Sequence, residues 1–126
     1  MQVMRIALIC AVVLCSVTAK ADVTTKNFLL KTTSDLITLC SVDGTGRDDV
    51  AAIHFCHGFL VGLTQFHAAV NKLFEGKIYC VNDANRPSRN DAITMFVKWG
   101  KSNPKYHQEL PLNGLLKWAS QAYPCL

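Results

Sequence analysis

The sequence is poor in charge and in long apolar segments. Only 17% of its 126 residues are charged, and after Val17 no apolar run reaches the roughly 20 residues of a membrane-spanning helix. The formal net charge of +4 is too small to indicate nucleic-acid binding. Half of the residues are apolar, so a disordered chain is excluded, and the length fits one domain. These absences exclude a multi-span membrane protein and disfavour a nucleic-acid partner.

The common patterns of catalytic and metal sites are also missing. There is no C-x2-C pair, and the spacings of 16, 24 and 45 between the last four cysteines do not fit zinc ligand pairs. His54 and His57 share one helix face, but no carboxylate completes a metal site. No Ser/His/Asp or Cys/His arrangement is evident. We therefore predict a protein that is not an enzyme, holds no metal and needs no cofactor.

The N-terminus has the pattern of a secretory signal peptide. Arg5 precedes the apolar run Ile6–Val17, and Ala19-Lys20-Ala21 provides small residues before a cut after Ala21. An uncleaved anchor helix is the alternative, but the run of about 12 residues is too short to span a bilayer. We expect residues 1–21 to be removed, leaving a periplasmic domain over residues 22–126 with no membrane attachment.

Four cysteines remain in that domain: Cys40, Cys56, Cys80 and Cys125. In an exported small domain an even number of cysteines indicates disulfides, and free thiols are the weaker alternative. The helix after Cys56 would carry the chain about 28 Å away, and the few residues before Cys80 reach back only about 17 Å. An up-down bundle then favours Cys40–Cys56 and Cys80–Cys125. A different winding would pair Cys40 with Cys80 and Cys56 with Cys125.

The periodicity of apolar residues predicts an all-α fold, a single small bundle of about four helices stapled by two disulfides, with no strand. Thr33/Ser34 is expected to cap a short first helix that reaches Cys40. The second helix is expected from Asp48 to about Glu75, with Gly76 as its C-terminal cap. This helix is apolar nearly all round, which predicts the buried centre of the bundle.

Two further helices complete the bundle. Ser88-x-x-Asp91 resembles a capping box at the start of the third, and Asn103-Pro104 stops it. Pro111 opens the fourth, where its missing N–H costs little. On the second helix, Gly58-x-x-x-Gly62 lets another helix approach closely; we expect a tight core contact, with a dimer seam as the alternative.

One loop between helices carries residues that a connector does not need. The segment Ser102–Leu110 is polar but contains Tyr106 and His107. We predict that these two residues anchor a protein partner, with Lys101 and Lys105 as a basic rim. A solvated turn is the alternative.

Several segments resemble one known family. They are NFLLKTTSDLITLCS, C-H-G-F-x-x-G from Cys56 to Gly62, Tyr79-Cys80, a helix ending in Ser-Asn-Pro, and LPLNGLLKWASQAYPC near the C-terminus. Together they resemble the Rap/Tai-type immunity proteins of bacterial type VI secretion. The similarity extends over nearly all of the chain after the predicted signal peptide.

The resemblance implies an exported, small, disulfide-bonded helical protein. It also implies that the partner is a toxic effector, which the protein binds and neutralises in the periplasm; some such toxins cut peptidoglycan, and several family members are homodimers. We therefore expect a periplasmic immunity protein with a cognate toxin as partner. The alternative is an acid-activated, disulfide-stapled periplasmic chaperone, because four histidines in so short a chain can change charge on acidification.

Overall fold

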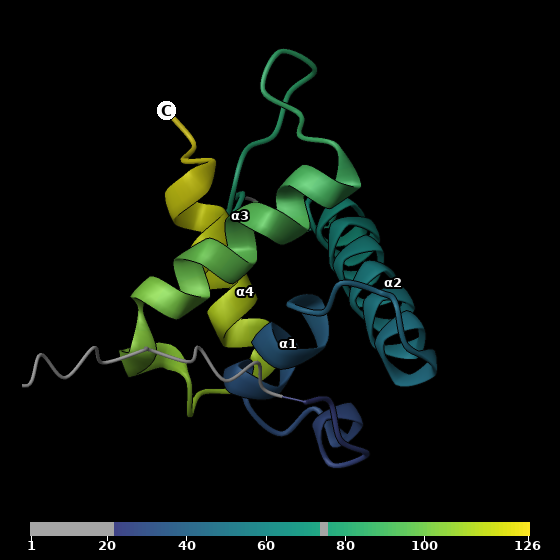
Figure 1. Cartoon of the computed structure of the whole chain (residues 1–126). Helices are drawn as coiled ribbons and strands as arrows, with labels where there is room; N and C mark the ends of the chain where they lie inside the picture. Colours follow the sequence, from purple (N-terminus) through teal and green to yellow (C-terminus); the bar gives the residue numbers. More distant parts are fainter. Residues whose placement is uncertain (1–21, 74–75) are drawn as a thin grey trace, which may run out of the picture.

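The structure, a computed structural model, describes residues 22–73 and 76–126 (Figure 1). Within these ranges the chain forms four α-helices, two single-turn 3-10 helices and no strand. The elements are η1 (Asn27–Leu29), α1 (Thr33–Cys40), α2 (Arg47–Val70), α3 (Arg89–Ser102), η2 (Pro104–Tyr106) and α4 (Pro111–Ala122). The predicted all-α bundle is confirmed. The predicted signal peptide and Glu75 lie outside the described residues.

Both predicted disulfides are present. Cys40 at the end of α1 is bonded to Cys56 in α2, and Cys80 is bonded to Cys125 beyond α4. The pairing argued from helix length is confirmed, and the alternative pairing is wrong. The bridges differ in burial, since Cys56 is fully buried whereas Cys125 is exposed.

The shortest α-helix, α1, occupies the centre of the fold (Figure 1). It packs against α2, α3, α4 and η1. Leu36 and Leu39 are completely buried, and Ile37 and Cys40 nearly so. Phe96 of α3 and Leu115 and Trp118 of α4 complete this core.

The prediction that the second helix is the buried centre is wrong. Ala52, Cys56 and Leu63 are the buried residues of α2, whereas Phe66 is 60% exposed and Leu73, just beyond the helix, is 75% exposed. Apolar residues on every face show that a helix could be buried, but not that other elements exist to cover it. In this small fold α1 takes the central position, and one side of α2 is left uncovered by the described residues.

The first helix begins one residue earlier than a Thr33/Ser34 cap would place it. Thr32 is the N-cap, and it forms a full capping box with Asp35. Thr33 points inward instead: it is fully buried, and its Oγ1 donates to the carbonyls of Glu109 and Leu110, both at 3.1 Å. The start of α1 is thus fastened to the segment that precedes α4.

The second helix ends earlier than predicted. It stops at Val70, and Asn71 is the C-cap, with its N–H bonded to the carbonyls of His67 and Ala69. Gly76 is therefore not the helix cap, although it does adopt a left-handed φ of 102°. It instead stands at the start of the loop that leads to α3.

The predicted ends of the last two helices agree with the structure. Ser88 caps α3: its Oγ accepts from the Asp91 N–H at 3.1 Å and donates to the Asp91 carboxylate at 2.6 Å. Asn103 follows the last residue of α3, and Pro111 opens α4.

Close helix packing occurs at glycines other than the predicted pair. Among the described residues, nothing lies within 4 Å of a Cβ added at Gly58 or Gly62, so the expected tight core contact there is wrong. A Cβ at Gly100 would instead lie 2.5 Å from the Ile37 side chain. A Cβ at Gly114 would overlap the side chain of Thr33. Gly100 and Gly114 thus let α3 and α4 approach α1.

Candidate functional site

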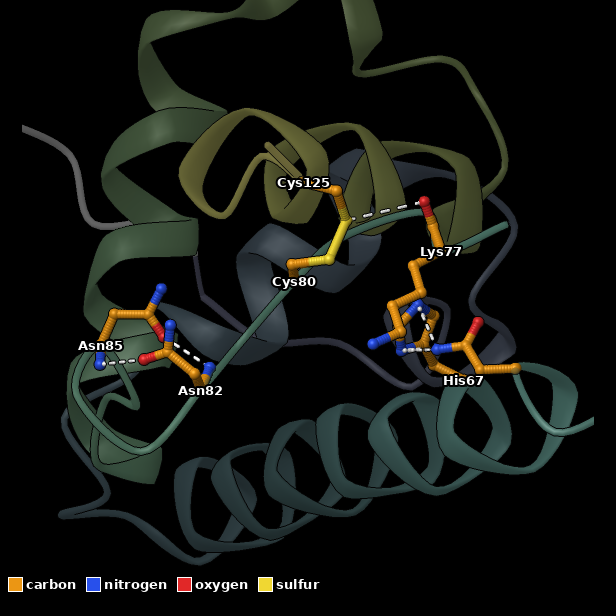
Figure 2. Close-up of a disulfide and its surroundings, with 7 residues drawn as sticks. His67, Lys77, Cys80, Asn82, Asn85 and Cys125 are labelled. Carbon is orange, nitrogen blue, oxygen red and sulfur yellow. Dashed lines mark hydrogen bonds between the residues drawn. A yellow bond between two sulfur atoms is a disulfide. The ribbon is translucent and has the colours of Figure 1, made fainter. Parts of the chain in front are cut away.

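The segment between α2 and α3, Gly76–Pro87, projects from the helical body (Figure 1). We call it the α2–α3 loop. Its base is fixed to the C-terminus by the Cys80–Cys125 disulfide and by a hydrogen bond from the Cys80 N–H to the Tyr123 carbonyl at 2.8 Å. Figure 2 shows this segment passing alongside α2, with the disulfide on its far side from the helix and His67 between it and the helix. The loop is therefore held at its base by covalent and packing contacts.

An aromatic stack fastens the loop to α2. The Tyr79 ring lies on the His67 imidazole, with ring centroids 3.9 Å apart. The Asn71 amide nitrogen lies 3.2 Å from a ring nitrogen of His67 (Figure 2). Burial raises the pKa of Tyr79 above 10.0. The aromatic stack thus joins a buried residue of the loop to the last turn of α2.

This environment disfavours the charged form of His67. Burial, and to a smaller extent the nearby Lys77 ammonium, lower the pKa of His67 below its usual 6.5. The unfolded chain takes up a proton near pH 6.5, whereas the folded chain does so only at lower pH. The contribution of His67 to stability is therefore present above pH 6.5 and is lost as the pH falls through its lowered pKa.

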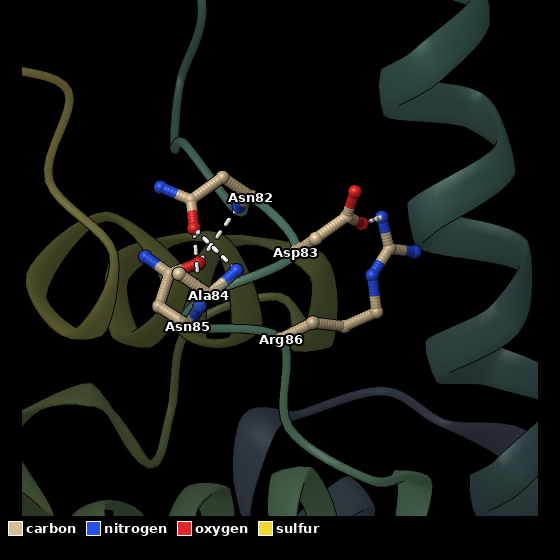
Figure 3. Close-up of polar contacts among 5 residues, drawn as sticks. All are labelled: Asn82, Asp83, Ala84, Asn85 and Arg86. Atoms are coloured by element: carbon tan, nitrogen blue, oxygen red, sulfur yellow. Dashed lines mark hydrogen bonds and ion pairs between the residues drawn. The ribbon is translucent and has the colours of Figure 1, made fainter.

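The tip of the α2–α3 loop is ordered by its own side chains (Figure 3). The Asn82 side-chain oxygen accepts from the N–H groups of Ala84 and Asn85, at 2.9 and 3.0 Å. The Asn85 side-chain oxygen accepts in return from the Asn82 N–H at 2.7 Å. Arg86 forms an ion pair with Asp83 at 3.0 Å. The tip is exposed yet has a defined conformation, which lowers the entropy cost of binding a partner.

A groove of about 750 Å³ lies beside the loop. One wall is α2 from His57 to Ala68, with Asn71 just beyond it, and the other consists of the α2–α3 loop, the start of α3, and α4. Its apolar lining includes Leu60, Leu63, Ile93, Leu115 and Trp118. Such volumes are typical of ligand and peptide sites. The exposed loop tip and the groove together form the most developed candidate binding surface among the described residues.

The residues predicted as partner anchors have contacts inside the protein. Tyr106 stacks on Trp99 with centroids 5.3 Å apart, and His107 Nε2 lies 2.8 Å from the Gly100 carbonyl oxygen. The His107 carbonyl accepts from the Ser34 N–H at 3.0 Å. These contacts give both side chains a packing role that the sequence pattern did not reveal. Their role in partner binding stays a prediction.

The two lysines predicted as a basic rim are exposed. Lys101 lies in the last turn of α3, and Lys105 lies in η2 with its Nζ 5.1 Å from the Tyr106 ring centroid. On α2, His54 is exposed and His57 is half-buried. Within residues 22–73 and 76–126, no group of three or more His, Cys, Asp or Glu side chains is placed to hold a metal. No helix in the same ranges has the length and hydropathy needed to cross a membrane.

No binding role was predicted from the sequence for the α2–α3 loop. The signal that could have identified it is Asn82-Asp83-Ala84-Asn85, because two Asn residues three positions apart can bond each other's backbone in an Asx turn. A turn of this kind directly after a bridged cysteine indicates a rigid exposed tip. The groove had no comparable signal, because its walls come from residues far apart in the chain.

The fold and the surface together define a small disulfide-bridged helical protein whose exposed features suit the binding of another protein. A family model described as "Rap1a immunity proteins" matches residues 32–125. The chain belongs to this family. The match confirms the predicted kinship with immunity proteins, a class that generally binds toxins and does not catalyse reactions. No curated protein and no solved structure matches the chain.

Proposed function

We propose that this protein is a periplasmic immunity protein that binds and neutralises a toxic effector of type VI secretion. The observation that carries the proposal is the family match over residues 32–125. The signal-like residues 1–21 support export, and two disulfides are usual in oxidising compartments. A peptidoglycan-degrading toxin is the class of target that best fits a protein acting in the periplasm.

The test is protection of growing bacteria. The effector or secreted hydrolase encoded beside this gene is directed to the periplasm of a host bacterium, with or without this protein. We expect growth to be restored by the full chain and not by a version lacking residues 2–21, because that version would stay in the cytoplasm. Equal protection by both versions would contradict the periplasmic setting, and no protection by either would contradict the immunity function.

The alternative function, an acid-activated chaperone, has one supporting observation. His67 loses its stabilising contribution at low pH, as its lowered pKa requires. In that case the protein would suppress the aggregation of an unfolding client at pH 5 and would give no protection against the neighbouring effector. Those two results together would replace the immunity proposal by the chaperone function.

We also propose that the protein forms a homodimer through the uncovered side of α2. The residues there follow heptad spacing, with steps of four and three residues: Phe55, Phe59, Gly62, Phe66 and Ala69 of α2, continued by Leu73 just beyond the helix. Phe59 is half-buried and the others are exposed. This spacing is the one by which two helices pair along their length.

The dimer is tested by sedimentation at micromolar concentration. We expect a dimer for the unaltered protein and a monomer for Phe66→Glu, because the substitution places a charge in the middle of the apolar contact. The melting temperature of Phe66→Glu should fall only through the loss of association, because Phe66 is 60% exposed in the single chain. A monomeric unaltered protein would exclude the dimer.

A further inference from the structure

The groove between α2 and the α2–α3 loop has an apolar floor and a basic rim. The floor includes the buried Leu63, Ile93 and Trp118 and the half-buried Leu60, Val61 and Ala92, whose exposed parts a ligand can contact. The charged residues that line the groove are Lys77, Arg86 and Arg89, and no Asp or Glu is among its lining residues. A ligand that fits this surface needs apolar side chains for the floor and carboxylates for the rim.

Two of these cations lie at separate places along the groove. Arg86 already pairs with Asp83, whereas no described carboxylate lies within ion-pair distance of Lys77 or Arg89. Lys77 influences His67, and Arg89 shares a smaller hollow with His57. His57 and His67 are ten residues apart on α2, which corresponds to about 15 Å along the helix. The two positive charges therefore stand near opposite ends of the groove.

This separation favours a peptide over a lipid. A fatty acid has one anionic group, which can meet one cation while its tail lies on the floor. A peptide segment can carry carboxylates at both ends and apolar side chains between them. The wall of α2 between the two ends also provides Thr64 and Gln65, whose hydroxyl and amide groups suit peptide backbone.

We infer that the groove binds an acidic amphipathic peptide segment of the protein partner, with carboxylates meeting Lys77 and Arg89 and apolar side chains on the floor. The identification of that partner as a toxin rests on the proposed function. The groove would then provide a second contact with the partner beside the loop tip, on a surface that is separate from Tyr106 and His107.

The probe is a library of random 12-residue peptides displayed on phage and selected against the purified protein. We expect the recovered peptides to carry Asp or Glu at two places with aromatic or aliphatic residues between them. A synthetic copy of a recovered peptide is then measured by fluorescence anisotropy. Binding should weaken at least about tenfold for Lys77→Glu/Arg89→Glu, and salt should have less effect on the remaining affinity.

The matched control is Lys98→Glu/Lys117→Glu, which changes the net charge by the same amount at exposed lysines outside the groove. We expect less than a threefold change for this variant and unchanged melting temperatures for both. Equal weakening by the two variants would show binding by net charge alone and would overturn the inference. Failure to recover acidic peptides would also overturn the inference. Stoichiometric binding of palmitate that is lost in Lys77→Glu/Arg89→Glu would overturn it as well, in favour of a lipid site.

The growth assay separates this inference from the proposed function. Full protection by Lys77→Glu/Arg89→Glu would overturn the groove as a toxin contact while the immunity function stands. Binding of acidic peptides by a protein that gives no protection would leave the groove as a peptide site and remove the immunity function.

Discussion

Replacing Cys40 and Cys56 together by alanine lowers the free energy of unfolding by about 4–5 kcal/mol and the melting temperature by about 15–30 °C. The bridge closes a separation of 16 residues, which in the chain-entropy account contributes about 3 kcal/mol. The rest of the loss comes from burial, because Cys40 is 4% exposed and Cys56 is completely buried. Alanine at both positions leaves a void between α1 and α2. Thermal unfolding followed by circular dichroism measures the change.

The second bridge provides the control. Cys80 and Cys125 are separated by 45 residues, so chain entropy alone predicts a larger loss, of about 4 kcal/mol, when they are replaced by serine. We expect a smaller loss of about 2–3 kcal/mol, because Cys125 is exposed. A lower melting temperature for the Cys80/Cys125 variant than for the Cys40/Cys56 variant would contradict this expectation. It would show that entropy of the unfolded chain, and not native burial, determines the contribution of each bridge.

The sequence predicted those features of the fold that depend only on neighbouring residues. Pro111 opens a helix, and Ser88 with Asp91 caps one, because these effects need only neighbouring residues. The length of the second helix excluded a Cys56–Cys80 bridge, and an up-down order of the helices then favoured the observed pairing. Such features depend on chain geometry over short distances, and the sequence contains that information directly.

The position of each helix in the bundle could not be predicted in this way. The second helix has more apolar residues than the first, yet Leu36 and Leu39 of α1 form the centre while Phe66 of α2 is exposed. Burial depends on which elements meet, and periodicity describes each helix alone. For the same reason Tyr106 and His107 resembled free anchors, because their partners Trp99 and Gly100 lie on a different element.

The glycines show most clearly that a sequence pattern does not reveal which helices meet. The Gly-x-x-x-Gly motif is at Gly58 and Gly62, but the close contacts are at Gly100 and Gly114. A motif marks places where a helix could be approached. The packing of the whole fold determines where another helix makes a close contact. Substitution by alanine turns this difference into opposite changes in stability.

Gly114→Ala is expected to destabilise the protein by about 2–3 kcal/mol and to lower the melting temperature by about 8–20 °C. The new methyl group would overlap the Thr33 side chain, whose Cβ lies 2.9 Å from the added atom. Thr33 cannot move away, because it is fully buried and its Oγ1 and N–H donate to the carbonyls before α4. The overlap should outweigh the gain of up to about 1 kcal/mol that alanine provides in a helix.

Gly62→Ala is the matched substitution at the predicted motif, and we expect the opposite sign. Gly62 lies within α2, and nothing described lies within 4 Å of its added Cβ, so the helix gains about 0.5–1 kcal/mol without a clash. Melting should be measured well below the concentration at which the proposed dimer forms, so that association does not contribute. Destabilisation by Gly62→Ala in the monomer would show that another part of the chain packs against this face. Tolerance of Gly114→Ala would show that α1 and α4 can separate at little cost, contrary to the close packing at Thr33.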